Sequence, residues 1–226
     1  MACAGAAWAI SLIILSSLVV ETLLSTTYFG PVQWYQKLYR AGFVVIEQWE
    51  NFQKQTYRNR CLIATTQGIQ VLTVPIERGN SQRIRDIRIS DHGNWRHLHW
   101  QALRSAYGES PFFEYYQDDI RPFFEKNWEY LLDFNEAIRE KICESIDIQP
   151  KVAYSKEFAV DSLQLTDGGP AGHDFRSAIN PKHPAEDPDF QPKPYYQVYR
   201  QKHGFLPNLS ILDLLFNMGP ESILYL

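Results

Sequence analysis

Short apolar runs separated by turn residues characterise the first third of the chain. Runs rich in β-branched residues are typical of buried strands. They predict strands at residues 22–27, 43–46, 60–64, 70–74 and 84–89. The sequence Thr-Thr-Gln-Gly at residues 65–68 separates two of these runs and predicts a hairpin turn. Pro31 suits the first position of a helix over residues 32–40, which Gly42 would end.

Apolar positions in the rest of the chain recur with helical spacing, which predicts amphipathic helices at residues 94–107 and 122–146. Residues 155–194 differ, because they are rich in Gly, Pro, Asp and Ser and have no sustained period. We expect a strand at residues 195–198 after them. A closing helix at 211–216 would begin with a capping-box-like pair of Ser210 and Asp213 and end before Gly219.

The alternation of predicted strands and helices indicates the fold class. A length of 226 residues suits one domain of ordinary size. We therefore expect a single α/β domain at residues 22–226, with a mixed β-sheet flanked by helices and a long loop-rich insertion near residues 155–194.

Residues 1–21 form a separate apolar segment, and residues 1–20 carry no charge. A stretch of this length can span a bilayer as a helix. Lys37 and Arg40 follow it, so an anchored domain would lie on the cytoplasmic face of the plasma membrane. A misassigned start is an alternative, as is a signal peptide, although no basic residue precedes the apolar run. The sequence does not decide between these three hypotheses. Under the first of them, residues 1–20 would contact the membrane.

Composition excludes global disorder, because apolar residues make up 45% and charged residues 21% of the chain. Aromatic residues reach 14%, which suits a thick core and also a site that stacks planar or sugar rings. Cys61 and Cys143 stand among apolar neighbours, so we expect buried reduced thiols and a cytoplasmic protein.

Charge is distributed unevenly along the chain. Residues 51–105 contain nine basic and three acidic residues, a net charge of +6, whereas residues 106–150 carry −7. A basic stretch inside an acidic protein can be a local anion site or simply a solvated, compensated surface. The overall charge of −4 argues against nucleic acid as a partner.

Arg58, Asn59 and Arg60 lie at the mouth of the predicted hairpin. Two guanidinium groups and an amide can bind a phosphate or carboxylate. The alternative is a turn with solvated arginines and an Asn that tolerates turn geometry. The positive charge of residues 51–105 favours the anion site over this alternative. Trp95 is a further candidate for contact with the substrate.

His99 and Glu47 are the candidates for proton transfer. An imidazole titrates near neutral pH and can act as acid or base. The alternative for His99 is a core histidine whose ring nitrogens are hydrogen-bonded. Glu47 follows a buried strand, where catalytic residues often lie in α/β folds, although a solvated strand-end acid is the commoner case. No metal-ligand spacing or cofactor motif is present, so we expect neither a metal nor a cofactor.

Several short motifs together resemble the WbqC-like family, which is found in bacterial O-antigen and other surface-polysaccharide gene clusters. They include Tyr28-Phe29-Gly30-Pro31-Val32-Gln33, Ile46-Glu47-Gln48, Tyr57-Arg58-Asn59-Arg60-Cys61, Leu72-Thr73-Val74-Pro75, Ile84-x-Asp86-Ile87, Trp95-x-x-x-His99-Trp100, Tyr107-Gly108-x-Ser110-Pro111-Phe112-Phe113 and residues 204–217. The resemblance covers residues 23–226. Many relatives have His-Gln-Pro after the first strand, where this chain has Ser25-Thr26-Thr27. A role for that histidine therefore does not carry over.

The resemblance implies a role in glycan assembly. It leads us to expect a cytoplasmic transferase that acts on a nucleotide- or lipid-linked sugar. Arg58 and Arg60 would then hold phosphate, Asn59 would orient it, and His99 would transfer a proton. The alternative is a non-catalytic protein that binds a glycan precursor or a partner enzyme.

Overall fold

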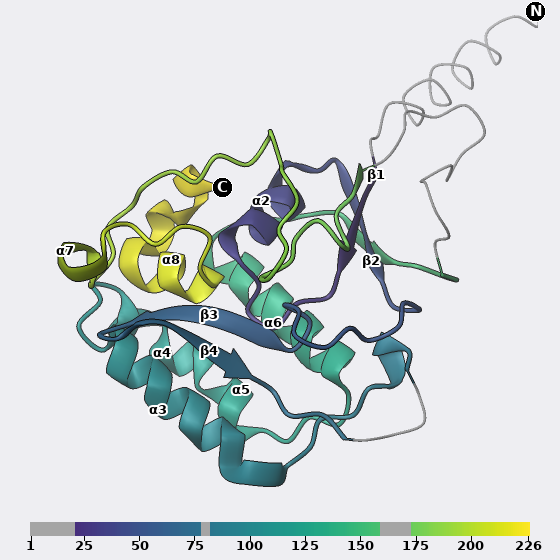
Figure 1. Ribbon diagram of the computed structural model, residues 1–226, viewed down its shortest axis with the longest axis horizontal. Helices are drawn as coiled ribbons and strands as arrows, with labels where there is room; N and C mark the ends of the chain where they lie inside the picture. Colours follow the sequence, from purple (N-terminus) through teal and green to yellow (C-terminus); the bar gives the residue numbers. More distant parts are fainter. Residues whose placement is uncertain (1–20, 78–81, 159–172) are drawn as a thin grey trace, which may run out of the picture.

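Residues 21–77, 82–158 and 173–226 are described by the computed structural model of the chain (Figure 1). The apolar segment expected at residues 1–21 lies outside them except for Glu21. Within the described ranges, no helix combines the length and the hydropathy needed to cross a membrane.

A parallel four-stranded sheet forms one part of the fold. Its strands stand in the order β5 (Val152–Tyr154), β2 (Phe43–Glu47), β1 (Glu21–Ser25) and β6 (His173–Asp174). All three neighbouring pairs are parallel, so the four carboxyl ends meet at one edge.

Helix α2 (Val32–Arg40) connects β1 to β2 and is buried on more than its apolar face. Nε1 of Trp34 donates to the carbonyl oxygen of Ser25 at 2.9 Å, which fixes the helix to the end of β1. Nζ of Lys37 lies 2.8 Å from the carboxylate of Asp187. The segment that follows β6 therefore covers α2.

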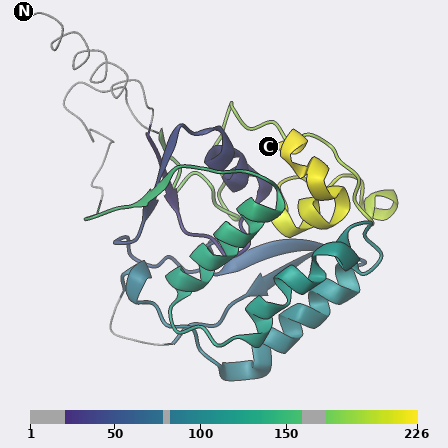
Figure 2. The same cartoon turned by 180° about the vertical axis from the view of Figure 1, so that it is seen from behind.

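A separate antiparallel hairpin consists of β3 (Arg60–Thr65) and β4 (Gly68–Thr73). Gly68 adopts φ +104°, a conformation that favours glycine, and completes the tight turn. The hairpin lies between helices α8 and α3, as Figures 1 and 2 show from opposite sides.

The remaining helices are α3 (Trp95–Tyr107), α4 (Phe113–Ile120), α5 (Pro122–Glu125), α6 (Leu131–Ser145), α7 (Arg200–His203) and α8 (Ile211–Met218). The described residues also form three 3₁₀ helices, η1 (Ile84–Asp86), η2 (His92–Asn94) and η3 (Gly219–Tyr225). The expected α/β class is confirmed, although the strands divide between a parallel sheet and the hairpin rather than joining one mixed sheet. Cys61 and Cys143 are buried free thiols, as expected.

The predicted strand at residues 84–89 is wrong. Its first three residues form η1, where the N–H of Ile84 donates to the carbonyl of Glu50. Beyond η1, the carbonyl of Ile87 accepts from the N–H of Leu131. These partners lie in loops and at a helix start, so no continuous ladder forms despite the alternating side chains.

The helix predicted at residues 122–146 is also wrong in its extent. Lys126 and Tyr130 are extended and separate α5 from α6. The predicted strand at 195–198 is irregular. Ser210 does cap α8, but Asp213 directs its carboxylate to other donors, so the expected capping pair is not reciprocal.

One buried hydrogen-bond network joins the hairpin, α3 and α8. The hydroxyl of Tyr107 donates to Oδ1 of Asp213 at 3.0 Å and accepts from the N–H of Ala64 at 3.2 Å. Oδ2 of Asp213 accepts from Tyr195 at 2.7 Å and from Gln197 at 2.8 Å. Burial raises the pKa of Asp213 to about 6. A carboxyl group enclosed in this way depends on its donors.

We expect Tyr107→Phe to lower the free energy of unfolding by about 2–3 kcal/mol, because the N–H of Ala64 and the carboxyl group of Asp213 each lose a buried partner. Chemical denaturation measures this. Tyr115→Phe is the control, since Tyr115 is exposed on α4 and should change stability by less than about 0.5 kcal/mol. Equal values for the two variants would mean that the network does not hold these elements together.

Candidate functional site

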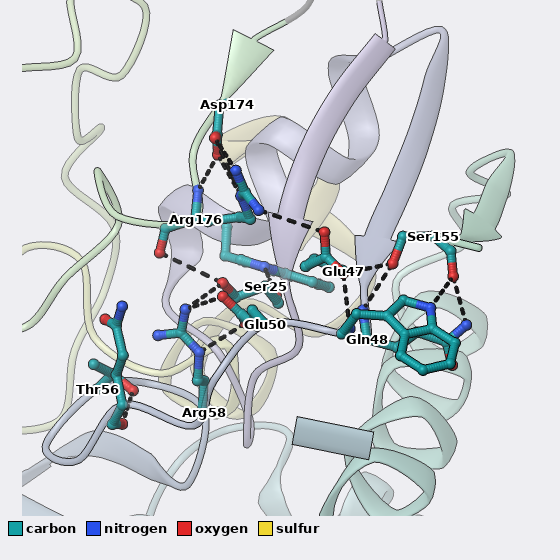
Figure 3. Close-up of polar contacts among 12 residues, drawn as sticks. Ser25, Glu47, Gln48, Glu50, Thr56, Arg58, Ser155, Asp174 and Arg176 are labelled. Atoms are coloured by element: carbon teal, nitrogen blue, oxygen red, sulfur yellow. Dashed lines mark hydrogen bonds and ion pairs between the residues drawn. The ribbon is translucent and has the colours of Figure 1, made fainter. Parts of the chain in front are cut away.

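The four parallel strands deliver polar side chains to one edge of their sheet (Figure 3). Ser25 ends β1 and Glu47 ends β2, whereas Ser155 follows β5 and Arg176 lies two residues beyond β6. The carboxyl edge of such a sheet is where ligands bind in open α/β folds. We call the group that meets here the strand-end cluster: Ser25, Glu47, Glu50, Arg58, Ser155, Asp174 and Arg176.

A buried ion pair between Arg58 and Glu50 lies inside this cluster. Nε of Arg58 donates to one carboxylate oxygen of Glu50 at 2.8 Å, and Nη2 donates to the other at 2.5 Å. Nη2 also donates to Oγ of Ser25 at 2.8 Å. The two charged side chains are only 3% and 6% exposed. Glu50 thus takes the bidentate position on Arg58 that a phosphate would otherwise occupy.

Glu47 is fully enclosed and held by several donors. Its Oε1 accepts from the hydroxyl of Ser155 at 2.6 Å and from the backbone N–H of Trp49 at 2.7 Å. Its Oε2 lies 3.4 Å from Nη1 of Arg176. These contacts fix the carboxylate, which in turn orients Ser155 and Arg176.

Arg176 is the more accessible arginine of the cluster, because its side chain is 13% exposed against 3% for Arg58. Nη2 and Nε of Arg176 donate to Asp174 at 2.7 and 3.1 Å. Burial opposes ionisation of Asp174, but the hydrogen bonds from Arg176 outweigh it and lower the pKa of this carboxyl group. Arg176 is therefore the cationic group that an anion approaching the cluster would meet first.

A further buried carboxylate, that of Glu136, lies on α6. Glu136 accepts from the hydroxyls of Thr26 at 3.3 Å and Tyr154 at 3.2 Å, and from Nε of Arg139 at 2.7 Å. Thr26 follows Ser25 and Tyr154 precedes Ser155, so Glu136 adjoins the strand-end cluster. Burial raises the pKa of Glu136 although Arg139 acts in the opposite direction. Because Tyr154 is exposed, only one side chain separates Glu136 from the surface.

Asn59 and Arg60 start the hairpin, and the contact recorded for Asn59 serves that hairpin. Nδ2 of Asn59 donates to the carbonyl of Val74 at 2.8 Å. Oδ1 of Asn59 and Nε of Arg60 are buried and have no hydrogen-bond partner among the described residues. Their predicted role in binding an anion stays a prediction.

His99 and Trp95 lie in an aromatic part of the core. The hydroxyl of Tyr28 is 2.9 Å from Nδ1 of His99. The ring centroids of Trp95 and His99 are 5.2 Å apart. Burial lowers the pKa of His99 to about 4, against the opposing hydrogen bond with the backbone of Thr73. Nε1 of Trp95 donates to the carbonyl of Ser90 at 3.0 Å. This environment matches the core-histidine alternative, and the catalytic role of His99 stays a prediction.

The strand-end cluster contains residues that sequence reasoning missed. Ser155, Asp174 and Arg176 fell in the stretch expected to be loop, because strands of three and two residues show no period. Glu136, which adjoins the cluster, was not selected from the sequence, although Arg139 one turn later on the same helix was a signal for an ion pair. Among the described residues, no group of three His, Cys, Asp or Glu side chains could hold a metal ion.

Comparison with known proteins identifies similar chains. A model of the WbqC-like protein family matches residues 26–179 and 182–225. Rv1507c, an uncharacterized protein of Mycobacterium tuberculosis, is 29% identical over 207 residues, which cover 81% of this chain and 87% of that protein. No solved structure matches the chain.

We expect Arg58→Ala to lower the free energy of unfolding by about 3–5 kcal/mol, because it leaves Glu50 buried without its charged partner. Adding Glu50→Ala should recover part of this loss, so the two effects would not add. Arg121→Ala is the control, because the Arg121–Glu125 pair is exposed and should matter by less than about 1 kcal/mol. A loss for Arg58→Ala as small as the control's would contradict a buried, interdependent pair.

The lowered pKa of His99 makes stability depend on pH. An unfolded histidine titrates near 6.5, so at pH values between about 4 and 6.5 the unfolded chain binds more protons than the folded one. Stability is then retained above pH 6.5 and is lost on acidification, by about 2 kcal/mol between pH 7 and 5. The stability of His99→Gln, measured by chemical denaturation at each pH, should not show this loss on acidification.

His97→Gln serves as the matched control, because His97 is exposed two residues earlier on the same helix. It should keep the pH dependence of the wild-type protein. If both variants and the wild-type protein lose equal stability on acidification, His99 is not a buried neutral imidazole.

Proposed function

The chain belongs to the WbqC-like protein family, and we propose that it is an enzyme of bacterial surface-polysaccharide biosynthesis. It would transfer a group to or from an anionic sugar that is linked to a nucleotide or a lipid, on the cytoplasmic side of the membrane. The observation that carries this proposal is the strand-end cluster, in which the ends of the four strands, the loop after β2 and the segment before β3 bring two arginines and three carboxylates to one sheet edge. Family membership supports the pathway, and the chemistry of the cluster supports the class of substrate.

Arg176 is the residue that would receive the phosphate of the substrate. It is the less buried of the two arginines, and its contact with Glu47 is a long 3.4 Å. An incoming phosphate could replace that contact and keep Asp174 as a support. Arg58 would remain on Glu50 and keep its positive charge beside the site without binding the ligand directly.

Glu136 is the carboxylate best suited to proton transfer. A base works well when its pKa lies near the working pH, and burial moves the pKa of Glu136 upward. Its hydrogen bond to the exposed Tyr154 leads toward the surface. Glu136 would accept the proton of the acceptor hydroxyl group while that oxygen forms a bond to the anomeric carbon of the donor sugar. The bond from that carbon to the phosphate oxygen breaks, and the nucleotide or lipid phosphate leaves, with its negative charge on Arg176. Glu47, which the sequence suggested for this role, would orient Ser155 and Arg176.

A non-catalytic precursor-binding protein is the second candidate. The observation that favours it is that Glu47, Glu50 and Arg58 are buried and bonded to one another or to neighbouring protein groups. Such saturation is also what a structural ion network would show. The transferase and the precursor-binding protein would bind the same sugar precursor, but only the transferase would convert it to product.

The test is nucleotide release from a panel of nucleotide sugars in the presence of a bacterial lipid extract. We expect Glu136→Gln to lower kcat by about 10²–10⁴-fold, as on removal of a positioned acid or base. Arg176→Gln should raise KM by about 10- to 100-fold, as on loss of a charge-assisted hydrogen bond. Melting temperatures show whether either variant remains folded.

Glu140→Gln is the matched control on the same helix, because its side chain is 69% exposed one turn after Glu136. It should leave kcat unchanged. Binding of a nucleotide sugar without any turnover would replace the enzyme by the precursor-binding protein. Full activity in both Glu136→Gln and Arg176→Gln would exclude the strand-end cluster as the site.

A further inference from the structure

A polar cavity of about 640 Å³ lies against α3, α4 and α5. Its volume is in the range of small-molecule sites. None of the residues of the strand-end cluster lines it. Any ligand of this cavity would therefore bind apart from the cluster.

Two helical stripes form the walls of the cavity. Arg96, Trp100 and Arg104 follow one another at intervals of four on α3, so their side chains share one face of that helix. Gln117, Arg121 and Glu125 repeat the same interval along α4 and α5. The two stripes meet across the cavity, which brings three guanidinium groups from separate turns to one space.

Arg96 has unsatisfied hydrogen-bond donors. Its Nη1 donates to Asp91 at 2.5 Å, but its Nε and Nη2 are enclosed and have no partner in the described part of the chain. Buried donors of this kind are rare in folded proteins, and an ion or water that the structure does not contain is a common explanation. These two atoms are enclosed, but Arg96 also lines the cavity, so its positive charge adds to the attraction that an anion in the cavity would meet.

The other two arginines add to the positive charge. Arg104 is exposed, and its side chain makes no hydrogen bond or ion pair with the described residues. Within the described ranges, Arg121 is paired only with Glu125. The cavity is thus lined by three arginines against two carboxylates, those of Asp91 and Glu125. Arg104 is available to an anion without breaking an existing contact.

An aromatic wall accompanies these charges. Trp100 and Phe124 both line the cavity, and their ring centroids are 5.9 Å apart. Aromatic faces attract planar or sugar rings, whereas guanidinium groups bind phosphate through paired N–H donors. The cavity therefore offers both kinds of contact to one small molecule.

We propose that this cavity binds a phosphorylated small molecule that carries a ring, with its phosphate on Arg96 and Arg104 and its ring against Trp100 and Phe124. This binding does not depend on the reaction at the strand-end cluster. The proposed binding would also assign a role to the basic stretch at residues 51–105. Arg96 and Arg104 belong to that stretch, whereas the strand-end cluster includes only Arg58 of its basic residues.

The experiment is calorimetric titration of the full chain with three probes: uridine 5′-diphosphate, inorganic pyrophosphate and uridine. We expect the diphosphate nucleotide to bind more tightly than pyrophosphate, and uridine to bind too weakly to measure. Arg104→Gln should weaken the two anionic probes by about 10- to 100-fold, as on loss of a charge-assisted hydrogen bond. Because the Arg104 side chain has no partner among the described residues, this variant should keep the wild-type melting temperature.

Two arginine variants serve as controls. Arg200→Gln removes an exposed charge on α7 and should leave the affinity for pyrophosphate unchanged. Arg176→Gln removes a charge from the strand-end cluster; it should weaken only binding at the cluster and leave the binding event that Arg104→Gln weakens unchanged, which separates this site from the proposed enzyme site. Absence of pyrophosphate binding, or binding that Arg104→Gln does not alter, would overturn the proposal. Loss of binding in Arg176→Gln with wild-type affinity in Arg104→Gln would assign the anion to the cluster instead.

Discussion

The enclosed ion pair between Arg58 and Glu50 is the constraint on which the candidate site depends. Removing two charges from water is unfavourable unless their partners are fixed in good geometry. Here both oxygens of Glu50 face Arg58, Ser25 adds a third contact, and Nδ2 of Asn135 donates to the backbone carbonyl of Arg58 at 2.8 Å. The pair thereby fixes the loop after β2, the end of β1 and α6 in relation to one another.

A consequence of this arrangement is a division of roles between two arginines. Arg58 is committed to the protein, whereas Arg176 belongs to the segment that follows β6 and retains some exposure. The buried pair holds the surrounding segments in place, whereas the outer arginine pairs with Asp174 at 2.7 Å and lies 3.4 Å from Glu47. In the proposed function, this outer arginine would respond to the ligand. Glu136 adjoins the same edge with a pKa that burial raises. In the proposed function, phosphate binding and proton transfer would therefore be carried by different residues of one small region.

Local signals in the sequence predicted much of the fold. The bounds of α2 follow from Pro31 and the apolar period, and the hairpin follows from its turn at residues 65–68. The helix predicted at residues 122–146 failed because the chain extends at Lys126 and Tyr130, where the backbone meets Ile87 and Ile89 from a distant segment. Contacts of that kind leave no local period to detect.

The site was harder to predict than the fold for the same reason. Glu47 and Arg58 could be selected because one follows a strand and the other precedes a hairpin. Their actual partners are Ser155, Arg176 and Glu50, and two of these lie more than a hundred residues away in sequence. His99 shares an apolar helix face with Trp95, and that pattern is common to core and catalytic histidines. The surrounding rings and the lowered pKa of His99 match the core alternative, and its catalytic role stays a prediction.

A crystal structure of the protein with the nucleotide sugar that it binds most tightly would test the central claim most directly. We expect the phosphate of the sugar within hydrogen-bond distance of Arg176, with Glu136 facing the acceptor side and Arg58 still paired with Glu50. Ligand density confined to the cavity of α3, α4 and α5, with the strand-end cluster unchanged and closed, would contradict the assignment of the cluster as the active site.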